Sequence, residues 1–260
     1  PGFAQGIMGP DLIEVMHKQA ERFGAEFISD DVIKVDFSKQ PFKVITEEKT
    51  YEAKAVIVST GASTKWLNLP SEQQLIGKGV SSCATCDAYF FKDKEVIVVG
   101  GGDSALEEAL FLTKFAKKVI IIHRRDELRA SKIMQDRAKK NEKISFIWDT
   151  AIEEIKDAKV GKVSAVVLKN LKTNKISEMK CDGIFVAIGH EPNTKLFKGI
   201  LTLDEKGYLI TEPRSTYTNI KGVFACGDVQ DHVYRQAITA AGTGCMAAID
   251  VERFLESEGH

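Results

Sequence analysis

The chain has 260 residues, of which 43% are hydrophobic and 28% charged, and this composition is typical of a soluble globular protein. Its 36 basic and 37 acidic residues give a formal net charge of -1, so we expect no nucleic-acid partner and no anionic membrane partner. Five scattered cysteines do not make a secreted disulfide framework and no apolar run reaches the roughly 20 residues of a membrane span, so a cytoplasmic location is expected.

A helix is the first element that the sequence predicts. Pro10 favours its start and Gly24 its end, and apolar residues recur at a helical spacing over 11–23. The residues expected on its buried side are Leu12, Ile13, Val15, Met16, Ala20 and Phe23.

Short strands are predicted next, at 26–37, 42–46 and 53–59. Together they indicate a small β-meander that leads back into a sheet. Thr60 and Gly61 follow the last strand, where a glycine would let the backbone approach a bound ligand. A plain strand-ending turn explains these two residues equally well.

A domain crossing is predicted near 68–72, and a pair of cysteines follows it. Cys83 and Cys86 are separated by two residues, a spacing that suits a redox disulfide, half of a structural zinc site or two buried thiols. No other cysteine or histidine stands at a pairing distance in sequence, so no metal is expected and redox use is favoured. Asp87 comes next, either as a helix cap or as a proton donor and acceptor for a thiolate.

The clearest pattern in the chain is a strand, a glycine turn and a helix. The apolar run 95–99 predicts a strand buried on both faces, and Gly100, Gly102 and Ala105 fit G-x-G-x-x-G/A. The first glycine makes the turn, the second lets a pyrophosphate approach the backbone, and the small third residue lets the helix pack on the strand. An ordinary glycine turn is the alternative interpretation.

The helix after this turn is expected to reach Phe115, with Asp103 or Ser104 as its cap. Its N-terminal N–H groups and dipole would hold phosphate. A second apolar run at 119–122 completes a βαβ unit.

Basic residues stand where an NAD site would carry Asp or Glu for the ribose. His123, Arg124 and Arg125 directly follow the second strand, and Arg129 comes about one turn later. Cations at this position suit a 2′-phosphate, so the expected cofactor is NADP. The alternative is a solvated basic loop.

The rest of this unit is predicted to end near Gly189, before a return crossing at 191–193. The elements expected on the way are a helix at 130–140, a strand at 144–148, a three-stranded antiparallel insertion at 151–155, 162–171 and 175–181, and a buried strand at 183–188.

The C-terminal part contains a second candidate ligand site. The apolar run 223–226 leads into Gly227 and Asp228, which places a carboxylate at the carboxyl edge of a sheet, where nucleotide ligands bind. A simple turn aspartate is the alternative. The long helix that follows opens with Arg235, Gln236 and Ala237.

Several motifs, in this order, resemble the low-molecular-weight, flavin-containing thioredoxin reductases: CATCDAYFF, VVGGGDSALEEALFL and HRRDELRASK. The resemblance continues through FVAIGHEPNT and GVFACGDVQDHVYRQAITAA, so it covers essentially the whole chain. It implies an α/β fold with two doubly wound nucleotide-binding domains of the FAD/NAD(P) type. The NADP domain, 70–190 with the CATC motif, would be inserted into an FAD domain made of 1–69 and 191–260.

The resemblance also implies an activity, namely NADPH-dependent thioredoxin-disulfide reduction in a homodimer. Electrons would pass from NADPH through FAD and the disulfide to thioredoxin or a similar small dithiol protein. Cys86 would lie nearest the flavin, Cys83 would attack the partner and Asp87 would manage the proton. The cofactor-binding residues would include Thr60, Gly61, Gly189, Gly227, Asp228 at the ribityl chain, Arg235, Gln236 and Ala237.

Two features depart from the family pattern. The only G-x-G-x-x-A after a buried strand starts at Gly100, so a first βαβ unit of about 30 residues or more is expected before Pro1. The chain alone should then hold NADP better than FAD. Ala88 stands where the family usually has glycine, at a cost on the order of 1 kcal/mol if the position needs a positive φ.

Other functions remain open at this point. A flavoprotein subunit of a peroxiredoxin (alkyl hydroperoxide) reductase system shares the architecture but usually has an extra N-terminal thiol domain. A non-catalytic NADP-binding fragment is the second alternative. For the reductase, we expect crossings near Pro70 and Pro192 to form a hinge pair that alternately brings the nicotinamide or the disulfide to the flavin.

Overall fold

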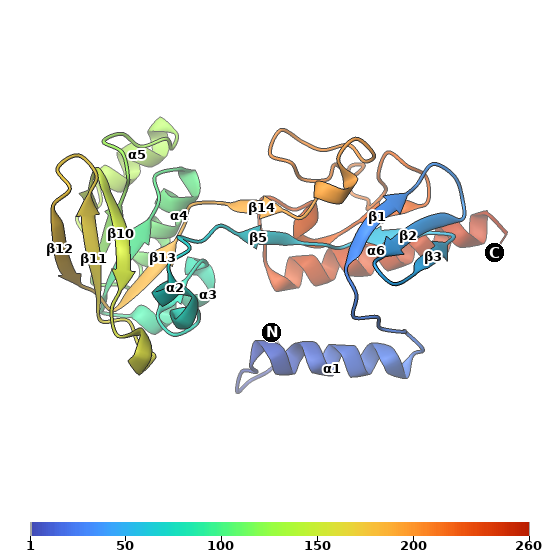
Figure 1. Ribbon diagram of the computed structural model, residues 1–260, viewed down its shortest axis with the longest axis horizontal. Coiled ribbons are helices and arrows are strands. Elements are labelled where there is room, and N and C mark those ends of the chain that lie inside the picture. The colour runs from blue at the N-terminus through green and yellow to red at the C-terminus, as the bar shows by residue number, and fades with distance from the viewer. Residues whose placement is uncertain (1, 260) are drawn as a thin grey trace. The chain divides into compact units, whose positions relative to one another are not determined.

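The computed structural model describes residues 2–259, and the chain divides into two units. One unit consists of Pro1–Ser63 and Pro192–His260, and the other is the continuous stretch Thr64–Glu191. The first crossing was expected near 68–72, whereas the structure divides the chain a few residues earlier. We call the continuous stretch the central unit and the other the split unit. Figure 1 labels the elements of both.

A five-stranded sheet forms the middle of the central unit. All its neighbouring strands are parallel. Their order is β6 (Val80–Ser81), β13 (Gly183–Val186), β7 (Glu95–Val99), β8 (Lys118–Ile122) and β9 (Ile144–Ile147). The side chains of β13 and nearly all of those of β7 and β8 are buried. This confirms the predictions of a strand buried on both faces at 95–99 and of a buried strand starting at 183.

Helices cover one face of this sheet. They are α3 (Ala84–Asp87), the 3-10 helix η1 (Ala88–Phe91), α4 (Asp103–Leu112) and α5 (Lys132–Lys139). Val96 and Val98 of β7 point to this face and pack with Leu106 and Leu112 of α4. Because side chains alternate along a strand, Ile97 of β7 points to the opposite face.

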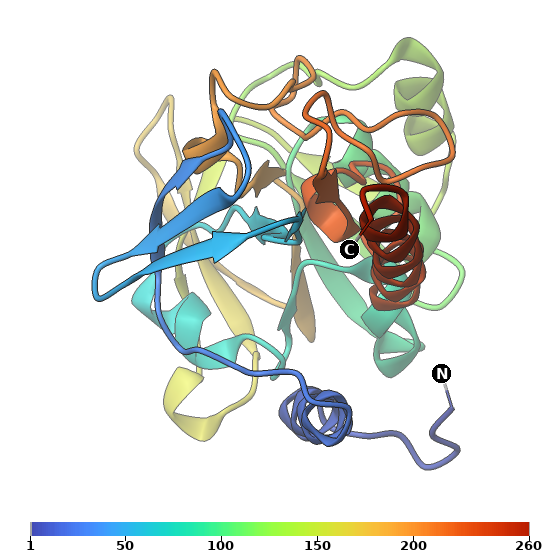
Figure 2. The same cartoon turned by 90° about the vertical axis from the view of Figure 1, so that its right-hand side faces the viewer.

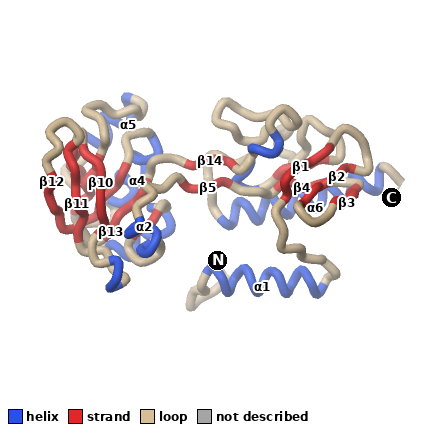
Figure 3. The backbone as a smooth tube through the Cα atoms, in the orientation of Figure 1, coloured by secondary structure: helices blue, strands red, loops and turns tan. Residues whose placement is uncertain are grey.

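A three-stranded antiparallel sheet covers the opposite face, as Figure 3 shows. Its strands are β10 (Thr150–Ile155), β11 (Ala165–Asn170) and β12 (Ile176–Lys180), and α2 (Pro70–Leu75) and the 3-10 helix η2 (Ala158–Val160) lie beside it. Ile152, Val166 and Leu168 pack there with Ile97 and Ile122 of the parallel sheet. The predicted antiparallel insertion is confirmed, and both faces of the parallel sheet are covered.

The split unit contains a meander of β1 (Val32–Asp36), β2 (Phe42–Thr46) and β3 (Thr50–Ala53). The first two strands were predicted, but the third was expected at 53–59, and most of that segment lies outside the meander. A separate parallel pair joins β4 (Val56–Val58) to β15 (Val223–Ala225), and α6 (Ala237–Ser257) contacts β15. The 3-10 helices η3 (Lys195–Phe197) and η4 (Gly227–Val229) complete the unit. Val35, Phe42, Val58 and Val223 lie in its core.

The first helix, α1 (Gly9–Arg22), forms where the sequence predicts it but has no buried residue. Ile13 and Met16, expected on its buried side, are 65% and 49% exposed. Figure 2 shows α1 apart from the meander strands. The expectation of a buried side is therefore wrong for residues 2–259, since none of them covers the apolar face of this helix.

Where the chain passes between the units, the two connecting segments pair with each other as β5 (Ala62–Thr64) and β14 (His190–Pro192). None of the helices within residues 2–259 is long and apolar enough to cross a membrane.

Candidate active site

A disulfide joins Cys83 to Cys86 at the start of α3. Cys86 is exposed and Cys83 is half-buried. The Thr85 hydroxyl lies 3.3 Å from Cys83 Sγ, and because a disulfide sulfur carries no hydrogen, the hydroxyl is the donor. Of the three uses of this spacing that the sequence leaves open, the structure therefore shows the disulfide. Within residues 2–259 no cluster of three or more His, Cys, Asp or Glu could hold a metal ion.

Asp87 and Ala88 follow the disulfide. Asp87 is half-buried, and its side chain makes no capping hydrogen bond to η1. Ala88 has helical backbone angles, φ -54° and ψ -34°, so the strain expected for a non-glycine residue does not arise. Ala84 and Ala88 are buried in the same cluster as Ala105, so α3 packs on the sheet face that carries α4.

The glycine turn after β7 needs its first glycine for two reasons. Gly100 has φ +149°, and a Cβ atom there would lie 2.4 Å from the Ala187 carbonyl oxygen and 2.8 Å from Ala105 Cβ. Gly102 differs, because no heavy atom outside its immediate neighbours lies within 4 Å of its Cβ position. The backbone is thus open at the glycine where a pyrophosphate would approach.

Helix α4 begins at Asp103, and its N-cap residue is Gly102, with no side-chain cap. The prediction that Asp103 or Ser104 caps this helix is therefore wrong. Instead, Asp103 Oδ1 accepts hydrogen bonds from the N–H and the hydroxyl of Ser131, both at 2.8 Å. Ser131 is the N-cap residue of α5, so one carboxylate connects the first turns of two helices. Ser104 is half-buried beside it.

The basic residues after β8 divide into two kinds. Arg124, Arg125 and Arg129 are exposed, whereas His123 is 5% exposed. A Cβ atom on Gly101 would lie 2.4–2.6 Å from three atoms of the His123 ring, so this ring lies directly against the glycine turn.

The burial of His123 also decides its charge. Burial lowers the pKa of the imidazole, the Glu127 carbonyl raises it, and the positive charges of the three arginines lower it further. The imidazole is therefore neutral near pH 7. Its Nε2 atom is buried and has no hydrogen-bond partner among the described residues. The positive charge at this position thus comes from the arginines and not from His123.

In the split unit, the structure brings two predicted turns to the same edge. Because β4 and β15 are parallel neighbours, Thr60 and Gly61 follow one strand end and Gly227 and Asp228 follow the adjacent one. Gly227 has φ +75°, and its N–H donates to the Thr243 hydroxyl at 2.9 Å.

Asp228 is half-buried, and its Oδ1 atom is buried without a hydrogen-bond partner in the described part of the chain. Burial raises the pKa of this carboxyl, and the charge of Asp231 adds to the effect, while Arg235 opposes it. Burying a carboxylate oxygen without a hydrogen-bond donor costs free energy, so this atom is suited to accept a hydrogen bond from a ligand hydroxyl.

Asn193 ties the end of β4 to the return strand, a role that the sequence did not reveal. Its side-chain amide donates to the Thr60 carbonyl at 2.8 Å, and its own carbonyl accepts from the Thr60 hydroxyl at 2.8 Å. Its N–H donates to the Gly61 carbonyl at 3.0 Å. Gly189, another predicted residue, has φ +109°, and its carbonyl accepts from Lys65 N–H at 2.9 Å.

The start of α6 is a second fixed turn. Arg235 has φ +48°, and its guanidinium donates to the His232 carbonyl at 2.8 Å. Gln236 is the N-cap residue and forms a capping box with Thr239. Ala237 is the first helical residue.

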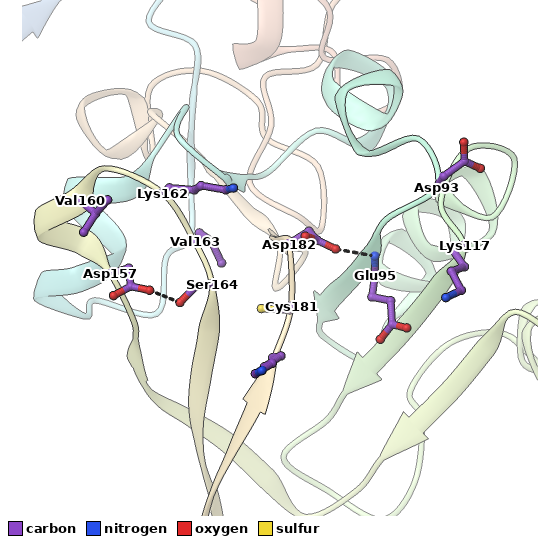
Figure 4. A pocket seen from close by; sticks show the side chains of 11 residues that line it. Asp93, Glu95, Lys117, Asp157, Val160, Lys162, Val163, Ser164, Cys181 and Asp182 are labelled. Atoms are coloured by element: carbon purple, nitrogen blue, oxygen red, sulfur yellow. Dashed lines mark hydrogen bonds between the residues drawn. The ribbon is translucent and has the colours of Figure 1, made fainter.

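Figure 4 shows a cavity of about 550 Å³ in the central unit, to which none of the predicted site residues contributes. It lies at the amino ends of β7 and β13, the sheet edge opposite the glycine turn. Carboxylates and ammonium groups line it together, including Glu95, Asp182 and Lys117. Burial raises the pKa of the lining Cys181 thiol to about 12, so this thiol is unreactive near neutral pH.

Comparison with known proteins decides the family. A thioredoxin reductase of Rickettsia conorii is 55% identical over 257 residues, which are 98% of this chain and 83% of that protein. One of Streptomyces coelicolor is 56% identical over 257 residues, covering 98% and 79% respectively. The chain belongs to the thioredoxin reductase family.

The wider family and the fold agree with this membership. Residues 5–244 match the family model described as pyridine nucleotide-disulphide oxidoreductase. The crystal structure of thioredoxin reductase from Streptococcus pyogenes is 43% identical with a TM-score of 0.92, covering 98% of this chain and 84% of that one. The predicted α/β fold class is confirmed, and so are the NADPH-dependent oxidoreductase activity, the FAD and NADP cofactors and the Cys83–Cys86 redox pair.

Proposed function

We propose that this chain carries electrons from NADPH, by way of FAD and the Cys83–Cys86 disulfide, to thioredoxin or a similar small dithiol protein. The observation that carries the proposal is the disulfide itself, on a helix packed beside the helix that follows the glycine turn. The overall step balances: NADPH and one proton convert the disulfide to two thiols and leave NADP⁺. The two thiols then pass two electrons and two protons to the partner's disulfide.

The NADP site would lie in the central unit, which corresponds to the predicted NADP domain 70–190. Gly102 and the first turn of α4 would hold the pyrophosphate, because the backbone there is open and the helix dipole favours an anion. Arg124, Arg125 and Arg129 are exposed and would bind the 2′-phosphate.

The FAD site would lie in the split unit, which corresponds to the predicted FAD domain 1–69 and 191–260. When bound, FAD accepts a hydride from NADPH and passes two electrons to the disulfide. Asp228 Oδ1 has no hydrogen-bond partner among residues 2–259 and fits a ribityl hydroxyl, and Gly227, with φ +75°, shapes the turn that presents it. The remaining residues proposed for this cofactor are Thr60, Gly61, Gly189, Arg235, Gln236 and Ala237.

The two cysteines would have different tasks. We assign Cys83 as the thiol that attacks the partner's disulfide and Cys86 as the thiol nearest the flavin. The Thr85 hydroxyl, a donor to Cys83 Sγ, would stabilise the developing thiolate. Asp87 is half-buried next to Cys86 in sequence and is not engaged in a helix cap, which suits a group that moves the proton.

Two assembly features belong to the same proposal. A homodimer in the cytoplasm would give the exposed apolar residues of α1, such as Ile13 and Met16, a surface to pack against. The paired connecting strands β5 and β14 would act as the hinge about which the units exchange the nicotinamide and the disulfide at the flavin. If a crosslink between the two units left turnover unchanged, the hinge proposal would be contradicted.

The test supplies the chain with FAD and follows NADPH oxidation with oxidised thioredoxin. The wild type should reduce thioredoxin, and Cys83→Ser and Cys86→Ser should each lower turnover by about a thousandfold or more. Cys245→Ser is the matched control, since Cys245 is exposed and lies outside the site. Retention of turnover by Cys86→Ser, or a wild type that leaves thioredoxin oxidised although it binds FAD and NADPH, would overturn the proposal.

A further inference from the structure

The loop that carries the arginines is attached to the glycine turn at its C-terminal end. The Gly101 carbonyl accepts hydrogen bonds from the N–H groups of Arg129 at 2.7 Å and Ala130 at 3.1 Å. One residue further along, Ser131 donates twice to Asp103 Oδ1. The backbone beside the proposed pyrophosphate position is therefore linked to the backbone of Arg129 by hydrogen bonds.

The other end of the loop is held by different groups. The Arg125 carbonyl accepts from Asp149 N–H at 3.2 Å, and Lys172 Nζ lies 2.6 Å from Asp126 Oδ2 and 3.1 Å from Asp149 Oδ2. Arg124 and Arg125 are thus positioned from the antiparallel sheet side, independently of Asp103. Loss of the Asp103 contacts should therefore displace Arg129 more than Arg124 and Arg125.

The charge of Asp103 is unusual at this place. A carboxylate near a pyrophosphate repels it, so the residue needs a reason to stand in the first turn of α4. The structure supplies one, because Oδ1 accepts two hydrogen bonds from the N-cap residue of α5, 28 positions away in sequence. A single acceptor thereby fixes both the helix that would face the pyrophosphate and the start of the next helix.

We propose that Asp103 is a positioning residue that sets the preference for a 2′-phosphorylated nucleotide by holding the Arg129 guanidinium at a fixed distance from the pyrophosphate turn. The inference rests on the proposed NADP site. It differs from a direct cofactor contact, because it requires only the hydrogen bonds that Ser131 donates to Asp103 and the adjoining one that Arg129 N–H donates to the Gly101 carbonyl.

The test measures binding of 2′,5′-ADP and of 5′-AMP to the 260-residue chain by calorimetry, without FAD or turnover. Asp103→Ala should lower the affinity for 2′,5′-ADP by about fivefold to tenfold and leave that for 5′-AMP within about twofold. Ser131→Ala removes one of the two bonds and should give a smaller loss in the same direction. Asp103→Asn keeps an oxygen acceptor at this position and should retain most of the preference.

Ser164→Ala is the matched control, since the Ser164 hydroxyl also donates to a carboxylate, that of Asp157, in the same unit. It should change neither affinity. If Asp103→Ala lowered the affinities for 2′,5′-ADP and 5′-AMP equally, Asp103 would have a direct or general role and the inference would be overturned. Unchanged affinities for both nucleotides would overturn it as well. A wild-type chain that binds neither nucleotide would instead overturn the proposed NADP site. Thermal unfolding of each variant shows whether it is folded, and Asp103→Asn and Ser131→Ala keep the test available if Asp103→Ala is not.

Discussion

The two units of the chain support their nucleotide-type turns in different ways. In the central unit, the strand before the glycine turn lies in the middle of five parallel strands and is covered on both faces. In the split unit, the strand before Asp228 is β15, which is also buried. It pairs in parallel with β4 and forms an antiparallel bridge from Phe224 to Tyr217 on its other side, and Ile57 of β4 is 39% exposed. The first turn therefore follows a strand in the middle of a five-stranded sheet, whereas the second follows a buried strand of a two-stranded parallel pair.

This difference has a consequence for stability. A closed core makes each buried side chain costly to remove, because the surrounding residues cannot collapse into the space. Removing a side chain from an exposed face costs little stability, because few neighbouring atoms lose contacts. The conformation of the glycine turn should thus depend strongly on the packing of α4, while the apolar residues of α1 should contribute little to the folded chain.

The largest expected effect compares the buried face of α4 with the exposed face of α1. Leu106→Ala should lower the free energy of unfolding of the central unit by about 2–5 kcal/mol, since Leu106 is fully buried between α4 and the sheet. Ile13→Ala should change stability by less than about 0.5 kcal/mol, because Ile13 is 65% exposed. Urea unfolding followed by circular dichroism measures both. Equal losses would show that the apolar face of α1 is as closely packed as that of α4.

The next effect separates folding from binding within the glycine turn. Gly100→Ala should destabilise the central unit by about 2–4 kcal/mol, because the new methyl group meets Ala187 and Ala105 at a φ of +149°. Gly102→Ala should change stability by less than about 1 kcal/mol, since the space at its Cβ is open, yet should weaken 2′,5′-ADP binding by about tenfold or more.

Denaturation and calorimetry on the same two variants check this pair. A stable Gly100→Ala protein would contradict the close packing of the turn. Unweakened binding by Gly102→Ala would show that the pyrophosphate does not approach this face.

The smallest effect concerns pH and the buried thiol of the central unit. The pKa of Cys181 is raised by burial from 9.0 to about 12, so at alkaline pH the unfolded chain loses this proton while the folded chain keeps it. The free energy of unfolding therefore falls as the pH rises from the unfolded pKa toward the folded one, by roughly 1 kcal/mol between about pH 8 and pH 10. Cys181→Ala should remove this part of the pH dependence, and Cys245→Ala, at an exposed position, should not. Identical pH profiles for wild type and Cys181→Ala would refute the burial effect.

Much of this architecture follows from short stretches of sequence. The strand, the turn and the helix around Gly100 are encoded by residues within about 20 positions, and so is the redox pair Cys83–Cys86. The first two meander strands and the antiparallel insertion were predicted for the same reason, because alternation and turn residues act locally. Some predicted boundaries were wrong: the strand expected at 26–37 begins only at Val32, and α4 ends at Leu112 and not at Phe115.

The positions of the turns and the NADP cofactor could be read from residue types at fixed local spacings, while the family and FAD followed from the resemblance to thioredoxin reductases. The folded structure was needed to show that Asp103 accepts from Ser131 instead of capping α4, that His123 is buried and neutral, and that α1 has no buried side. It also decided that Asn193 holds Thr60 across 133 positions. These outcomes depend on which distant backbone groups the fold brings within hydrogen-bond reach and on which faces find a partner, and no local pattern encodes either.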